Sequence, residues 1–228
     1  LYGDTPLLRT KTIKNILNMH RAHNASCTLL TAQLKNPTGY GRIKRSSHNN
    51  IVKIIEELDA SIYDKVIEEI NVGVYCFNKA VLFEALKKIT PENEKKEYYL
   101  TDTIEVIARS SRKIASVLLD DPDEFLGVNT RIELSQVEHI IRKRILDTIM
   151  QSGVTIIDPE NTYIEEEVHI GKDTIIYPYT FIENNVKIGT SCSIGPFARV
   201  RSGSSIKDRS SIGNFVEIVR SEIGEDTK

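Results

Sequence analysis

The sequence predicts an α/β domain, a long connecting helix and a solenoid of parallel β-strands made of hexapeptide repeats. Helix-like and strand-like segments alternate over the first half of the chain, as in layered α/β proteins. The apolar spacing over 130–150 is that of an amphipathic helix. Beyond it, ten aliphatic residues recur at an unbroken interval of six: Ile164, Ile170, Ile176, Ile182, Ile188, Ile194, Val200, Ile206, Ile212 and Ile218. We expect the three parts to span 1–129, 130–153 and 154–228.

In the first part the predicted elements follow from apolar periodicity. Ile13, Ile16 and Leu17 recur at intervals of three and four, which indicates a short helix. Apolar runs predict strands over 27–31, 51–57 and 70–77, and helical spacing returns over 79–89. The segment 36–41 is dense in turn-forming residues, so we expect a loop there.

The helix and the solenoid have different periods. Leu134, Val137, Ile141 and Ile145 predict one apolar face along the helix. A period of six suits a coil with three flat faces, each placing one aliphatic side chain inside. Glycines at 171, 189, 195 and 213 each follow an inward residue, where we expect turns with positive φ. Because about three coils are near the minimum for a continuous core, we also expect burial against other subunits.

The composition indicates a globular protein. A net charge of -2 with interspersed charges argues against nucleic acid as a partner. No apolar run reaches the roughly 18 residues of a membrane span and no signal-peptide pattern is present, so we expect a cytoplasmic protein without a membrane partner. The three cysteines are far apart and are expected to be reduced. We expect an internal fragment, because the chain begins at Leu1 without methionine and stops within the repeats.

Two segments near the start are candidates for a ligand site. Asp4, which follows Tyr2 and Gly3, could hold Mg²⁺ at a strand end, or it could cap the following turn. The segment 37–42 could present backbone N–H groups to a ligand, or it could be a bare surface loop. The residues taken singly leave both alternatives open.

The order of the motifs is far more specific than any one of them. LYGDTPLL, PTGYGRI, EELDA, EINVGVYCF, EYYLTD and GVNTR follow in succession, and the repeats close with GPFARVRSG and GNFVEI. Over nearly its whole length the chain closely resembles the bifunctional bacterial UDP-N-acetylglucosamine pyrophosphorylase and glucosamine-1-phosphate N-acetyltransferase family. The resemblance implies a Rossmann-like nucleotidyltransferase domain, here partial, a connecting helix, and a left-handed β-helix that assembles as a homotrimer.

The same resemblance implies that the first domain joins UTP to N-acetylglucosamine 1-phosphate and releases pyrophosphate. Mg²⁺ would be held by Asp4 of YGD and Asn129 of GVN, whose oxygens suit this cation. No protein nucleophile is expected, because the sugar phosphate itself attacks the nucleotide. The other positions that match the sugar-nucleotide site are Tyr2, Gly3, Gly41, Glu56, Asn71, Tyr99 and Thr101. Without the resemblance, Glu56 could equally be a solvated strand-end charge and Asn71 a turn residue.

A second activity implied by the resemblance is acetyl transfer from acetyl-CoA to glucosamine 1-phosphate. Arg201 of ARVRSG matches the arginine that binds the sugar phosphate, and a guanidinium suits that task. The lysine usual after GNFVEI is Val219 here, and Leu58 and Lys96 depart from the pattern of the first site. We expect the phosphate loop and the acetyl-transfer histidine to lie outside this sequence, and the fragment alone to be inactive.

Two other interpretations stay open. A related nucleotidyltransferase could use another sugar 1-phosphate, with a solenoid that serves only assembly or regulation. Alternatively, the protein could be a scaffold that binds a sugar nucleotide without turnover, which the substitutions at Val219 and Leu58 would favour.

Overall fold

The computed structural model describes residues 1–228 and divides them into two compact units, Leu1–Thr130 and Arg131–Lys228. The first unit has one apolar cluster on each face of a sheet, and the second has a single continuous core. No helix combines the length and the apolar character that crossing a membrane would require.

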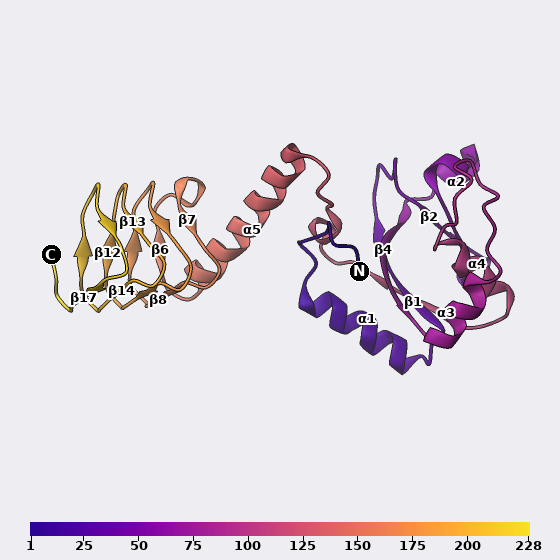
Figure 1. The fold of residues 1–228 in the computed structure, drawn as a ribbon, viewed down its shortest axis with the longest axis horizontal. Helices are drawn as coiled ribbons and strands as arrows, with labels where there is room; N and C mark the ends of the chain where they lie inside the picture. The colour runs from indigo at the N-terminus through magenta and orange to yellow at the C-terminus, as the bar shows by residue number, and fades with distance from the viewer. The chain divides into compact units, whose positions relative to one another are not determined.

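The first unit is a mixed five-stranded sheet with helices on both faces (Figure 1). Its strands are β1 (Cys27–Gln33), β2 (Arg42–Arg45), β3 (Ile51–Ile55), β4 (Glu69–Phe77) and β5 (Ile114–Leu118), in the order β3-β2-β4-β1-β5. Only β1 and β5 are parallel neighbours. The helices are α1 (Thr10–Ala22), α2 (Ile62–Lys65), α3 (Lys79–Leu86) and α4 (Asp102–Arg109), with 3₁₀ turns η1 (Glu57–Asp59) and η2 (Pro122–Phe125). The predicted α/β class is confirmed.

Strand β1 lies in the middle of this unit and is buried on both faces. Successive side chains of a strand point to opposite faces, so Leu29 packs with Ile104 of α4 while Leu30 packs with Ile16 of α1. The prediction of a strand over 51–57 is two residues too long, because η1 begins at Glu57 and turns the chain away from the sheet.

The second unit is a helix followed by a parallel solenoid. Helix α5 spans Arg131–Gln151. The solenoid contains β6 (Thr155–Ile156), η3 (Pro159–Asn161), β7 (Tyr163–Ile164), β8 (His169–Ile170), β9 (Ile175–Ile176), β10 (Phe181–Ile182), β11 (Lys187–Ile188), β12 (Ser193–Ile194), β13 (Arg199–Val200), β14 (Ser205–Ile206), β15 (Ser211–Ile212), β16 (Glu217–Ile218) and β17 (Glu222–Ile223). The strands β6 to β17 form three parallel sheets of four strands each, the arrangement of a left-handed β-helix (Figure 1).

The ten aliphatic residues that recur at an interval of six, called here the six-residue ladder, lie in the core of the solenoid, as predicted. Nine of its ten residues are buried, and Ile170, on the end strand β8 of its sheet, is partly buried against the same core. Ile223 of β17 follows Ile218 after five residues rather than six, yet it pairs with Ile206 and contacts the core. The spacing therefore predicted the inward residues from Ile164 to Ile218, but not Ile156 of β6 or Ile223 of β17 at the two ends.

The turns of the solenoid differ from the prediction. Positive φ recurs at the third residue after the inward one, at Asp173, Tyr179, Asn185, Ser191, Phe197, Gly203, Arg209 and Phe215. Of the four glycines expected to take positive φ, only Gly195 does so, with φ of 92°. For Gly171, Gly189 and Gly213 the expectation was wrong. A Cβ on Gly171 would lie 2.6 Å from the carbonyl carbon of Gly189 in the next coil, so this glycine permits close backbone contact.

Replacement of Gly171 by alanine is expected to destabilise the solenoid by about 1–3 kcal/mol, the usual cost of overpacking. Gly213→Ala is the matched control, because a Cβ there would meet nothing within 4 Å. We expect this second change to alter the free energy of unfolding by less than about 0.5 kcal/mol. Denaturant unfolding of the two variants measures the difference, and equal effects would contradict the close-approach explanation.

Helix α5 packs on the solenoid through residues that are not part of the predicted apolar face. Leu146 is buried in the solenoid core, with Ile149 and Met150 packed against it. Of the predicted apolar face, Val137 is buried, whereas Leu134 and Ile141 are exposed. Leu146, Ile149 and Met150 are also spaced by three and four, but they lie on a different face of the helix from Leu134 and Ile141, and α5 contacts β6 and β7.

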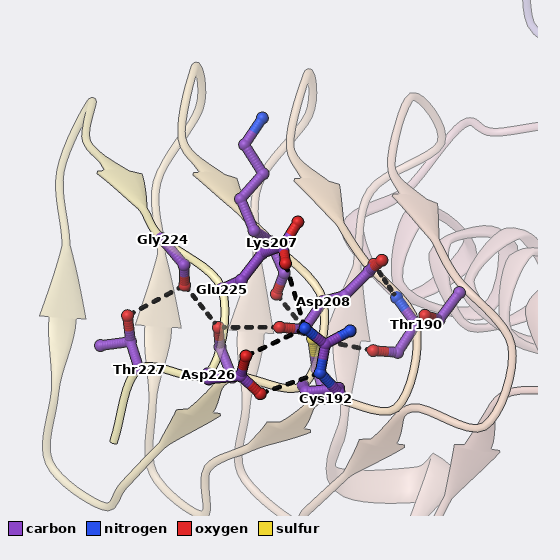
Figure 2. A network of polar contacts seen from close by, with 10 residues as sticks. Thr190, Cys192, Lys207, Asp208, Gly224, Glu225, Asp226 and Thr227 are labelled. Carbon is purple, nitrogen blue, oxygen red and sulfur yellow. Dashed lines mark hydrogen bonds and ion pairs between the residues drawn. The ribbon is translucent and has the colours of Figure 1, made fainter.

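Polar groups join successive coils at the turns (Figure 2). The carboxylate of Asp208 accepts the N–H of Thr190 at 2.7 Å, and the carbonyl of Asp208 accepts the N–H of Asp226 at 3.1 Å. Arg209 pairs with Asp226 at 2.8 Å and with Glu225 at 3.0 Å. These ion pairs are exposed and contribute little stability, so the buried ladder is the main support of the solenoid.

Candidate active site

Gly41 lies where the loop 36–41 enters β2. Its carbonyl accepts the N–H of Asn71 from β4 at 2.8 Å. A Cβ at this position would lie 3.1 Å from Cγ2 of Ile54 and 3.4 Å from Oε2 of Glu56. The absence of a side chain therefore lets the backbone approach the end of β3 and leaves the Glu56 carboxylate uncovered on this side.

The carboxylate of Glu56 is oriented from the other side by Thr101. Thr101 is buried at the start of α4, and its hydroxyl donates to Oε1 of Glu56 at 2.8 Å. Glu56 and Thr101 are 45 residues apart in sequence. The fold thus joins Gly41, Glu56, Asn71 and Thr101 through two hydrogen bonds and one close contact.

Asn71 presents its amide group in a fixed orientation. Its Oδ1 accepts the hydroxyl of Tyr75 at 2.9 Å and the N–H of Gly73 at 3.2 Å. Because the oxygen is occupied, the NH₂ group is the part of the amide that can donate to a ligand. Gly73 has φ of 83°, and a Cβ there would overlap the ring of Tyr2, so the tyrosine lies against the strand backbone.

Tyr2 connects this cluster with Asp4. Burial raises the pKa of Tyr2, and the nearby charges of Glu56 and Asp4 raise it further. The backbone carbonyl of Asp4 accepts the N–H of Val128 at 2.8 Å. This bond places Asp4 beside the segment that ends in Asn129.

The donor chemistry of Asp4 and Asn129 fits Mg²⁺. A Cβ on Gly127, two residues before Asn129, would lie 3.8 Å from both the Asn129 side-chain nitrogen and the Asp4 backbone carbonyl oxygen. The protein contains no group of three His, Cys, Asp or Glu side chains that could hold a metal by themselves. Magnesium commonly binds through one or two protein oxygens together with substrate phosphates, so two donors are enough for this kind of site.

Carboxylates make the surroundings of Glu56 acidic. Burial raises the pKa of Asp102, and the charges of Glu105, Asp59 and Glu56 raise it further. Burial also raises the pKa of Tyr99, with contributions from Asp59 and Glu56. Tyr99 thus lies in the electrostatic field of the same carboxylates, while Gly3 is exposed with open space around its Cα.

The family described as "Nucleotidyl transferase" matches residues 3–123, just over half of the chain. This range contains Gly41, Glu56, Asn71 and Thr101. The chain belongs to the nucleotidyl transferase family.

Individual relatives are similar to this chain over a longer range than the family match. The "Bifunctional protein GlmU" of Acetivibrio thermocellus is 51% identical over 178 residues, which are 78% of this chain and 39% of that protein. The proteins of the same name from Pelotomaculum thermopropionicum and Lactococcus lactis subsp. lactis are 47% and 49% identical, over 78% and 75% of this chain and 39% and 38% of their own lengths. The chain therefore spans about two fifths of the length of these relatives.

The solenoid of this nucleotidyl transferase carries the remaining predicted site residue. Arg201 follows β13, and its guanidinium lies 3.6 Å from Glu183 and 3.4 Å from Glu217. The N–H of Ser202 and the guanidinium of Arg199 lower the pKa of Glu183. Arg201 is therefore an exposed cation between two carboxylates. An anion that binds Arg201 would have to displace these carboxylates.

Sequence reasoning missed two residues that shape the site in the nucleotidyl transferase unit. Tyr75 donates to Asn71, and Gly73 admits the ring of Tyr2. The glycine gave a usable signal, because a glycine inside a strand often marks a close approach of other atoms. Tyr75 gave none, since an aromatic residue in a strand usually indicates packing alone.

Proposed function

We propose that the protein containing this chain transfers a uridylyl group from UTP to N-acetylglucosamine 1-phosphate. The supporting observation is that two hydrogen bonds and one close contact link Gly41, Glu56, Asn71 and Thr101, which are distant in sequence, within the nucleotidyl transferase unit. The relatives named bifunctional GlmU contain equivalent sequence over more than three quarters of the chain.

Each of these groups has a role that its contacts permit. Glu56 accepts hydrogen bonds from sugar hydroxyls, and Thr101 keeps its carboxylate in place. The NH₂ group of Asn71 donates to an acceptor on the sugar. Gly41 leaves room for the sugar ring beside Glu56, while Tyr2, Gly3 and Tyr99 border the same region.

The reaction needs no nucleophile from the protein. A phosphate oxygen of the sugar 1-phosphate attacks the α-phosphorus of UTP, the bond from that phosphorus to the bridging oxygen of the β-phosphate breaks, and pyrophosphate leaves. Mg²⁺, when bound by Asp4 and Asn129, would neutralise charge on the phosphates. The protein residues contribute by holding the sugar phosphate in line with the nucleotide.

Substrate profiling tests the choice of sugar. We expect kcat/KM for N-acetylglucosamine 1-phosphate to exceed those for glucose 1-phosphate and mannose 1-phosphate by at least about tenfold, because polar groups left unpaired by the wrong sugar weaken its binding. A preference for another sugar would support the related nucleotidyltransferase. Binding of UDP-N-acetylglucosamine without any turnover would support the scaffold.

The solenoid supports a second proposed activity, acetylation of glucosamine 1-phosphate by acetyl-CoA. In this step the sugar amine attacks the thioester carbonyl, CoA leaves as the thiol, and the amine loses a proton. Arg201 would bind the sugar phosphate. We also propose that the protein is a homotrimer. The stacked rings of Tyr179, Phe197 and Phe215 on successive coils support this, because exposed apolar side chains of this kind mark protein–protein interfaces. A cytoplasmic location is proposed as well, because UTP and acetyl-CoA are available there.

Arg201→Met should raise KM for glucosamine 1-phosphate by about 10- to 100-fold, the effect of losing hydrogen bonds to a charged group. Arg209→Met is a matched control, since Arg209 is also a solenoid arginine between carboxylates. We expect the control to leave this KM within about twofold and neither variant to change uridylyl transfer. Equal KM values for the two variants would remove Arg201 from the acetyl-transfer site.

A further inference from the structure

The most deeply buried cation of the first unit lies one residue after Gly41. The side chain of Arg42 on β2 is only 2% exposed. A buried guanidinium is costly unless its charge is paired, and because the Nε of Arg42 has no hydrogen-bond partner, the pairing depends on its two Nη groups. Its Nη2 donates to Oε2 of Glu57 at 2.7 Å, and its Nη1 donates to the carbonyl of Tyr40.

Glu57 extends this pair to the loop. The same Oε2 accepts the N–H of Gly39 at 3.2 Å, and Lys65 lies 3.8 Å from Oε1. The Arg42 guanidinium also holds the pKa of the Glu57 carboxyl below its ordinary value. One ion pair therefore fixes the backbone of two successive residues, Gly39 and Tyr40.

We call the Arg42–Glu57 ion pair the clamp. The two residues next to the clamp are the ones that would contact the sugar. Gly41 follows Tyr40, and Glu56 precedes Glu57. The clamp joins the same two segments as the close contact between Gly41 and Glu56. A change in the clamp therefore moves Gly41 and Glu56 relative to each other. A shift of a few tenths of an ångström at Gly41 would alter the space beside the Glu56 carboxylate.

We infer that Arg42 and Glu57 are positioning residues, which set the distance between Gly41 and Glu56 and thereby the affinity for the sugar 1-phosphate. The inference about substrate affinity rests on the proposed function. The geometric part, that Glu57 holds the loop 36–41, does not depend on it.

A second ion pair on the same strand supplies a matched control. Arg45 of β2 pairs with Glu69 of β4 at 2.7 Å, the same distance as in the clamp. The two glutamates are similarly covered, with side-chain exposures of 24% for Glu57 and 17% for Glu69. The Arg45 pair bonds to Asn49 and Ser116 and does not touch the loop 36–41.

Steady-state kinetics of Glu57→Ala and Glu69→Ala in the full-length protein test the substrate part. For Glu57→Ala we expect KM for N-acetylglucosamine 1-phosphate to rise at least about fivefold, with kcat and KM for UTP within about twofold, because the clamp affects ground-state binding. Glu57→Gln, which keeps an acceptor oxygen for Gly39, should recover most of the loss. Glu69→Ala should leave all three constants within about twofold.

Hydrogen exchange over residues 36–42, measured by mass spectrometry, tests the geometric part without substrate. Exchange should accelerate in Glu57→Ala and stay at the wild-type rate in Glu69→Ala. Unchanged exchange, or equal changes in both variants, would overturn the inference. Faster exchange with an unchanged sugar KM would overturn its substrate part alone, and absence of turnover in the wild type would overturn the proposed function instead.

Discussion

Asp4→Ala in the full-length protein is expected to lower kcat/KM for uridylyl transfer by at least about 100-fold, the scale seen when one electrostatic contact to a transition state is lost. The reason is the loss of one of two protein oxygens proposed to hold Mg²⁺. The concentration of Mg²⁺ that gives half-maximal rate should rise at the same time. Initial rates of pyrophosphate release over a range of Mg²⁺ concentrations measure both effects.

Asp120→Ala is the control for this experiment, because Asp120 is an exposed carboxylate of the same unit. We expect it to leave both the rate and the Mg²⁺ dependence unchanged. Acetyl transfer should be unaffected by either substitution. A loss of less than about threefold in Asp4→Ala would show that the metal assignment is wrong.

Ile194→Ala should lower the stability of the solenoid by about 2–5 kcal/mol, the usual cost of removing a large aliphatic side chain from a core. Ile194 of β12 is fully buried, and it stacks between Ile176 and Ile212 of the neighbouring coils. The truncation therefore leaves a cavity lined by rigid strands on both sides. Denaturant unfolding, followed by a signal from the solenoid, gives the free energy of unfolding.

Ser193→Ala tests the specificity of that effect on the same strand. Ser193 points away from the core and is partly exposed, so we expect a change within about 0.5 kcal/mol. A loss below about 1 kcal/mol in Ile194→Ala would contradict the role of the six-residue ladder as the main support of the solenoid.

The solenoid could be predicted from the sequence because its geometry repeats. Each inward position obeys the same rule, so Ile164 and Ile218 report the same environment. The turns could not be predicted from glycine, because positive φ falls three residues after the inward position, where Gly203 is the only glycine among Asp, Tyr, Asn, Ser, Phe and Arg residues. The buried Leu146 of α5 was also missed, since burial there depends on coils that follow it in the chain.

The candidate site was only partly accessible to sequence reasoning. The resemblance carried by the motif order predicts Glu56 and Asn71 as sugar-binding residues, but no local pattern shows that Thr101 bonds Glu56, because that contact joins segments 45 residues apart. Arg42 gave no sign of burial, since an arginine on a short strand is usually exposed. Its partner Glu57 was expected at the end of a strand, whereas the 3₁₀ turn directs it back to the loop.

The most direct test of the proposed site is a crystal structure of the full-length protein with UDP-N-acetylglucosamine and Mg²⁺. The sugar should lie beside Gly41, with its polar groups about 2.6–3.2 Å from the Glu56 carboxylate and the Asn71 amide. The cation should be bound by Asp4 and Asn129 together with phosphate oxygens. A nucleotide sugar bound elsewhere, with Glu56 and Asn71 facing only solvent, would contradict the proposed function.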